Sequence, residues 1–187
     1  MVDSTHTFTF ESLRNGGLGI SAAYGSFLAE AASYCLHLRK HSNPVRLLLT
    51  GNYSSSGIFQ WDNSAGGLSR TYADLQEGTE YGACAVAIVV AVHLTGITHV
   101  ERSAKGTGID YWLGQGNEET GIFQRAARLE VSGIFEGSES KISARLRKKL
   151  SQTARSDKTL LPAYIAIVEF GSPETRLVKN DPQETDL

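Results

Sequence analysis

The feature that most constrains the fold is an almost entirely apolar run, Tyr81–Leu94 (YGACAVAIVVAVHL). Its 14 residues fall short of the roughly 20 that a membrane-spanning helix needs, and they include His93. A helix that is apolar on all sides is typical of the buried centre of a domain. The run therefore predicts a soluble protein built around this helix, with no membrane partner.

The composition fits one domain with an ordinary core. The chain has 187 residues, of which 41% are hydrophobic and 20% are charged. Its 18 Lys and Arg against 20 Asp and Glu give a net charge of −2. This balance excludes a protein that binds polyanions through its overall charge, but it allows a local basic patch. The two cysteines, Cys35 and Cys84, exclude a disulfide scaffold and fit a reducing compartment, so we expect a cytoplasmic protein.

Hydrophobic periodicity and turn residues predict an α/β (α+β) single domain with a mixed central sheet flanked by helices. A first helix is expected at 21–41, ended by Asn43-Pro44, and a strand at 45–49. Residues 51–70 suggest a hairpin or an anchored loop. The following expected elements are a helix at 72–94, strands at 98–103, 108–113 and 123–134 with a polar loop at 114–120, a helix at 138–153, and a strand at 163–170 that 176–178 extends. Residues 1–70 then form an N-terminal addition to a core at 71–178, and 179–187 a frayed tail.

Two carboxylates stand among apolar residues of successive expected strands. Asp110 lies in GIDYWLG, and Glu130 lies in ARLEVSG, twenty residues later. Burying a carboxylate without a partner costs several kcal/mol, so each of these groups needs a partner. Two inward carboxylates on adjacent strands can converge, raise each other's pKa and be stabilised by a divalent cation. Because Mg²⁺ prefers oxygen ligands and keeps several waters, the pair suggests a magnesium site with room for a phosphate.

The order helix, three strands, helix, strand, with Asp110 and Glu130 on successive strands, resembles the core of the PD-(D/E)xK nuclease superfamily. This superfamily includes many restriction endonucleases, Holliday-junction resolvases and repair nucleases. The resemblance covers roughly residues 72–170 and implies a restriction-endonuclease-like core. It also implies that Asp110 and Glu130 bind Mg²⁺, or Mn²⁺, and that Glu80, or Glu77 one turn earlier, supplies the acidic residue of the preceding helix.

The sequence departs from the family at Ser132, which stands where the family places its lysine. In the family that lysine orients water and stabilises charge at the phosphate. Lys105, in the glycine-flanked turn before Asp110, is the expected catalytic substitute. The other cations that could replace the lysine are Arg128, Lys141 and Arg145.

Basic residues concentrate on and after the expected helix at 138–153. Seven of the 18 Lys and Arg lie between Lys141 and Lys158, where they could follow a phosphate backbone or simply form a solvated helix face. The residues expected to contact nucleic acid, DNA rather than RNA, are Lys141, Arg145, Lys148 and Lys149. Residues 1–70 could in addition contact a second copy of the chain or a partner protein.

Simpler roles for the same carboxylates stay open at this point. Asp110 could bond a turn amide or Arg102, Glu130 could pair with Arg128 along its strand, and Glu77 and Glu80 could be first-turn charges that favour the helix dipole. The sequence therefore leads to two hypotheses. One is a metal-dependent nuclease, and the other is a catalytically silent nuclease-like domain that acts as a binding or assembly subunit of a larger complex.

Overall fold

The computed structural model describes residues 6–62, 68–117, 121–153 and 158–182. Their helices and strands in chain order are β1 (His6–Phe8), α1 (Glu11–Arg14), α2 (Ala22–Leu38), β2 (Val45–Gly51), β3 (Ser55–Phe59), α3 (Leu68–Thr71), α4 (Leu75–Thr95), β4 (His99–Arg102), β5 (Tyr111–Asn117), β6 (Ile122–Ile134), α5 (Glu139–Thr153), β7 (Ala163–Glu169) and β8 (Glu174–Asn180). The strands of the described residues form one mixed sheet in the order β1-β3-β2-β8-β7-β6-β5-β4. The α+β class expected from the sequence is confirmed.

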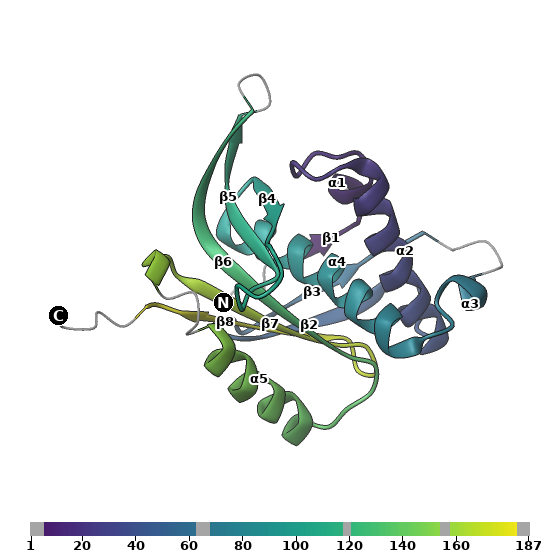
Figure 1. The fold of residues 1–187 in the computed structure, drawn as a ribbon. Helices are drawn as coiled ribbons and strands as arrows, with labels where there is room; N and C mark the ends of the chain where they lie inside the picture. The colour runs from purple at the N-terminus through teal and green to yellow at the C-terminus, as the bar shows by residue number, and fades with distance from the viewer. Residues whose placement is uncertain (1–5, 63–67, 118–120, 154–157, 183–187) are drawn as a thin grey trace.

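Helices cover both faces of this sheet (Figure 1), with α2 and α4 on one face and α5 on the other. Because side chains alternate along a strand, each strand in the middle of the sheet contributes to two clusters. Along β7, Ala166 and Val168 belong to the large cluster that includes α4, whereas Ile165 and Ile167 pack with Ile142 of α5. The sheet is thus buried on both faces where α4 and α5 overlap it.

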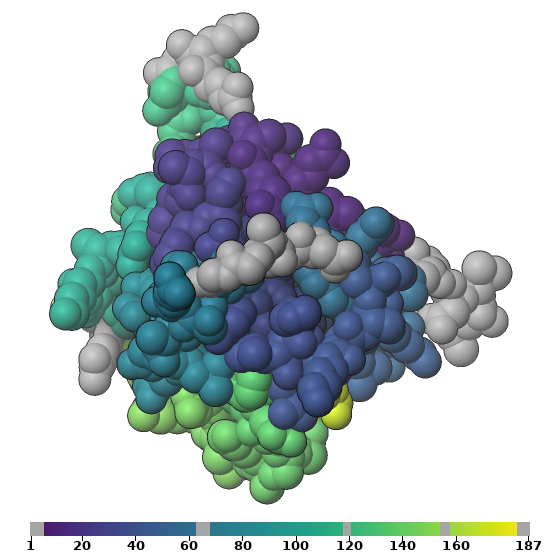
Figure 2. Space-filling model, turned by 90° about the vertical axis from the view of Figure 1, so that its right-hand side faces the viewer, coloured from purple at the N-terminus to yellow at the C-terminus, as the bar shows by residue number. Residues whose placement is uncertain are grey.

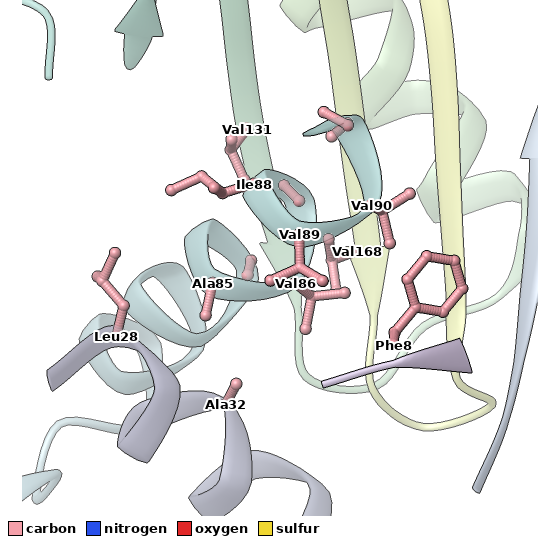
Figure 3. Close-up of a cluster of buried hydrophobic side chains, with 14 of the residues drawn as sticks. Phe8, Leu28, Ala32, Ala85, Val86, Ile88, Val89, Val90, Val131 and Val168 are labelled. Carbon is pink, nitrogen blue, oxygen red and sulfur yellow. The ribbon is translucent and has the colours of Figure 1, made fainter. Parts of the chain in front are cut away.

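The apolar run predicted to be a central helix lies in α4. The helix begins at Leu75, later than the expected Tyr72, because the Asp74 side chain accepts hydrogen bonds from the first free backbone amides. It ends at Gly96, whose φ of +72° is left-handed. By length and composition alone α4 could cross a membrane, but 61% of its most apolar 18-residue stretch is buried inside this fold. Figure 3 shows α4 between α2, which contributes Leu28 and Ala32, and the strands of the sheet.

The strands β4 to β7 determine where the candidate site lies. β4 pairs with β5 and β5 with β6 in antiparallel fashion, whereas β6 and β7 are parallel and joined by α5. A parallel pair requires such a crossover connection, and the amphipathic sequence of α5 provides it. The helix–three strands–helix–strand order expected after Tyr72 is therefore present.

Residues 6–62 continue the same sheet. β2 pairs with β8 on one side and with β3 on the other, and β1 pairs with β3. The hydrophobic cluster that includes α4 extends from Phe8 to Leu177. Figure 2 shows one side of the molecule, where the purple and blue atoms of this N-terminal segment cover much of the surface.

Three further expected boundaries are wrong. The strand expected at 108–113 begins only at Tyr111, because the turn with left-handed glycines at 106 and 108 continues up to Asp110, which therefore precedes β5. The polar loop expected at 114–120 is strand as far as Asn117, because the β5–β6 hairpin continues beyond a bulge after Leu113. The chain expected to fray from Lys179 is strand through Asn180, because β8 is hydrogen-bonded to β7. The remaining parts of the last two predictions, residues 118–120 and 183–187, lie outside the described residues.

Candidate functional site

The two predicted carboxylates lie together at the start of β5. Asp110 immediately precedes β5, and its backbone amide donates to the carbonyl of Leu129, the residue that pairs with Tyr111, so the end of the turn stays attached to β6 beside Glu130. One Asp110 oxygen, Oδ2, accepts the backbone amide of Val131 at 2.8 Å. The expected turn-amide partner of Asp110 is thus an amide of the neighbouring strand.

Asp110 and Glu130 line one cavity of about 630 Å³ at the end of β4. The turn between β4 and β5 forms one wall of this cavity, and the C-terminal half of α5 forms another. The charged and amide side chains that line the cavity are Arg102, Lys105, Asp110, Glu130, Lys149 and Gln152. The cavity therefore brings together two carboxylates and three cations from four segments of the chain.

Glu130 is the most perturbed carboxylate in this cavity. The residue is only 3% exposed. Burial, and next the negative charge of Asp110, raise the pKa of Glu130 to about 7, while the hydrogen bond and charge of Lys149 oppose the increase. The distance between Lys149 Nζ and Glu130 Oε1 is 2.5 Å, and the Lys149 side chain is 17% exposed. Glu130 therefore lies between a like charge and an opposite charge, at a pKa where a cation and a proton compete for it.

The position of Lys149 follows from the packing of α5 against β6. Lys149 contacts Glu130, and Arg145 Nη1 donates to Ser132 Oγ at 3.2 Å. Four residues of a helix rise about 6 Å, and two residues of a strand span about 6.6 Å. The spacing of Arg145 and Lys149 along α5 therefore matches the spacing of Ser132 and Glu130 along β6. Ser132, where the family has its lysine, is in contact with an arginine from α5, and Glu130 has a lysine from the same helix. The sequence prediction placed Lys149 only on nucleic acid and missed this contact.

The other predicted cations differ in how close they lie to the carboxylates. Lys105 lines the cavity from the β4–β5 turn. Lys141 lies at the other end of α5 and donates to the carbonyl of Glu136, and Lys148 is exposed. Arg128 is fully buried and donates to the carbonyls of Leu161 and Thr153. The ion pair that the structure gives Glu130 is therefore with Lys149, rather than with Arg128 of its own strand.

The structure places Glu80 in a neighbouring cavity. That cavity, of about 300 Å³, is lined by Glu80, Gly133 and Arg145 among others, and it does not include Asp110 or Glu130. Glu80 accepts a hydrogen bond from Gln76, and Glu77 accepts one from Tyr81. The third metal ligand expected from the preceding helix thus stays a prediction.

A divalent cation fits the donors that the described part of the chain offers, provided that water supplies most of its ligands. No group of three or more His, Cys, Asp or Glu side chains that could hold a metal ion occurs among these residues, so in this cavity the protein ligands would be the Asp110–Glu130 pair alone. Mg²⁺ is commonly held by one or two carboxylates together with waters and substrate phosphates. The size of the cavity and the proximity of the two carboxylates are compatible with that arrangement.

The chain was also compared with known proteins. Neither the models of protein families nor the curated protein sequences give a match.

Proposed function

We propose that this protein is a metal-dependent nuclease that hydrolyses phosphodiester bonds, in DNA rather than RNA. The single observation that carries the proposal is the convergence of Asp110, Glu130 and Lys149 on one cavity. A pair of carboxylates beside a lysine is a combination suited to phosphoryl chemistry, because the carboxylates can hold a cation and the ammonium group can stabilise charge on the phosphate. The resemblance of the element order to PD-(D/E)xK nucleases adds to this support.

In this mechanism each residue of the cavity has a distinct task. Asp110, held at one oxygen by the Val131 amide, would hold the cation together with Glu130. Mg²⁺ or Mn²⁺ bound there supplies Lewis-acid activation of water and neutralises charge on the phosphodiester. Glu130 would share the cation with Asp110, and Lys149, its ion-pair partner, would supply the positive charge beside the phosphate that Ser132 lacks. Lys105 contacts a phosphate oxygen from the turn.

The basic side chains of α5 would guide the substrate to this cavity. Lys141, Arg145 and Lys149 are spaced four residues apart and lie along one stripe of the helix, of which Arg145 and Lys149 face β6 at the cavity, whereas Lys141 and the adjacent Lys148 are exposed. Such a stripe neutralises successive phosphates, so DNA binding weakens steeply as the salt concentration rises.

Both cysteines are free thiols, which supports a cytoplasmic location for the enzyme.

The experiment that tests the proposal is cleavage of plasmid and oligonucleotide DNA with Mg²⁺ or Mn²⁺. Asp110→Asn and Glu130→Gln are expected to lower the rate at least about a hundredfold, and Lys149→Met about 10²- to 10³-fold. Glu136→Gln and Arg147→Met are the matched controls, because both side chains are exposed and lie outside the cavity. Full activity of Asp110→Asn would contradict the proposal.

One observation favours a second function, a catalytically silent domain that binds nucleic acid or a partner protein in a larger complex. Glu130 already has an ion-pair partner in Lys149. An ion pair of this kind can stabilise the buried carboxylate without a metal ion. In that case the protein binds DNA with the salt dependence expected of α5, but no metal concentration produces cleavage. DNA binding that is absent altogether would leave assembly as the role of the domain.

A further inference from the structure

A second cavity lies along the outer edge of β4, beside the carboxylate cavity. It has a volume of about 440 Å³ and is enclosed by the loop before α2, by β4 and by the far half of the β5–β6 hairpin. Figure 1 shows this hairpin extending past β4 on the side of α1. We call it the hairpin cavity, and it is lined by Ile20, His99, Arg102, Gly116, Ile122 and Phe123 among others.

The hairpin cavity is largely apolar, with a few polar groups. Phe123 and Ile122 come from β6, and Ile122 is 65% exposed. The His99 ring fits between Gly19 and Gly116, where a Cβ at either position would overlap the ring. His99 Nδ1 bonds the hydroxyl of Thr98, whereas His99 Nε2 is buried with no hydrogen-bond partner in the described residues. A flat ligand with apolar faces and hydrogen-bonding edges matches these walls.

Arg102 connects this cavity to the candidate site, because it lines both. Its guanidinium lies over the ring of Tyr24, 5.3 Å from the ring centroid, and it forms no ion pair with the described residues. A fixed, exposed cation between two cavities is well placed to contact a phosphate. The four residues of β4 span about 13 Å at 3.3 Å each, which is roughly the length of three or four stacked nucleotides at 3.4 Å per nucleotide.

We infer that the hairpin cavity binds the base of an unpaired nucleotide, a few positions from the phosphodiester held at Asp110 and Glu130. This inference rests on the proposed nuclease function and names its substrate class, which is nucleic acid with unpaired bases, either single-stranded or at a duplex end. A base in this cavity would stack on Phe123, while Arg102 contacts a phosphate between the two cavities. A base inside an uninterrupted duplex must first leave its stack, and the cost of doing so disfavours that substrate.

The test measures binding separately from cleavage. The probes are one short single-stranded oligonucleotide and its duplex, with Ca²⁺ in place of Mg²⁺ to prevent turnover, and with the fluorescent base 2-aminopurine placed at each position in turn. In the wild-type protein, the fluorescence of one position should be quenched by stacking, and the single strand should bind about tenfold tighter than the duplex. Asp110→Asn, which removes a cation ligand, should retain the quenched position.

Ile122→Glu is the decisive variant, because it places a negative charge at the mouth of the cavity on a side chain that is already exposed. It should abolish the position-specific quenching and weaken single-strand binding about tenfold, with duplex binding unchanged. Leu38→Glu, at the exposed end of α2, is the matched control and should bind as the wild type does.

Three outcomes overturn the inference. Quenching could be equal at all positions, single strand and duplex could bind equally, or Ile122→Glu could leave binding unaltered, as it would if the cavity served a peptide or a partner protein. Failure of the nuclease proposal is distinguishable from these, since it would appear as an absence of cleavage with Mg²⁺ or Mn²⁺ in the wild-type protein even when a base is bound.

Discussion

At the scale of single residues, the protonation of Glu130 is the property most open to measurement. Its pKa is raised to about 7 from an ordinary 4.5, first by burial and then by the charge of Asp110. In the metal-free protein we therefore expect Glu130 to take up a proton as the pH falls through about 7. A metal ion that binds Glu130 must displace that proton. The affinity of the protein for Mg²⁺ should therefore rise with pH across this range and level off above it.

Two substitutions should move this titration in opposite directions. Asp110→Asn removes a negative charge and should lower the pKa of Glu130, whereas Lys149→Met removes the stabilising ammonium group and should raise it. The measurement is a pH titration of the Glu130 carboxyl carbon by NMR in the metal-free protein, with Arg147→Met as the control of unaltered pKa. A Glu130 pKa that stays the same in both variants would show that the carboxylates and Lys149 do not interact.

The sequence could predict which carboxylates meet, but not which cation joins them. Asp110 and Glu130 are each flanked by apolar residues, and that local pattern predicted that both would be drawn inward, as their shared cavity shows. The contact between Lys149 and Glu130 depends on the rotation of α5 about its axis and on its position along β6. Both are set by the packing of Ile142 against the strands, which local sequence does not reveal. Glu80 illustrates the same limit, since the rotation of α4 places it in the neighbouring cavity.

At the scale of elements, the contact between α2 and α4 depends on small residues. Gly82 of α4 lies so close to the backbone of Ala32 that a Cβ would be 2.9 Å from the Ala32 Cα. Alanine favours a helix over glycine by about 1 kcal/mol, but overpacking in a core costs about 1–3 kcal/mol. We therefore expect Gly82→Ala to lower the free energy of unfolding by up to about 2 kcal/mol, as measured by urea denaturation.

Gly78→Ala provides the comparison within the same helix. The new Cβ would lie 3.2 Å from the Tyr72 Cβ, a contact that is relieved by a shift of a few tenths of an ångström, so the gain in helix propensity should roughly offset it. If Gly82→Ala were as stable as Gly78→Ala, the close approach of α2 and α4 would not exist in solution. Such an approach is also hard to predict from sequence, because small residues occur on several sides of α4 and are compatible with many helix partners.

At the scale of the whole molecule, the structure changes the role expected for the N-terminal segment. The sequence suggested an addition at 1–70 beside a core at 71–178, because the nuclease resemblance begins near Tyr72. In the structure, β2 is hydrogen-bonded to β8, and α2 covers α4, so the two parts share one sheet and one hydrophobic cluster. Pairing between strands so distant in sequence leaves no local signal, and the boundary could not be judged from periodicity.

A shared core predicts that both parts unfold together. The two tryptophans report on them separately, because Trp61 lies in the N-terminal segment and Trp112 in β5, and both are buried. In Trp112→Phe and Trp61→Phe, the fluorescence of the remaining tryptophan should follow the loss of helical circular dichroism through one denaturant transition with the same midpoint. If Trp61 became exposed at a lower denaturant concentration than the helices melt, residues 1–70 would be a separately folding layer. Loss of β2 would then leave β8 as an open edge without unfolding the carboxylate site, so metal binding would survive the first transition.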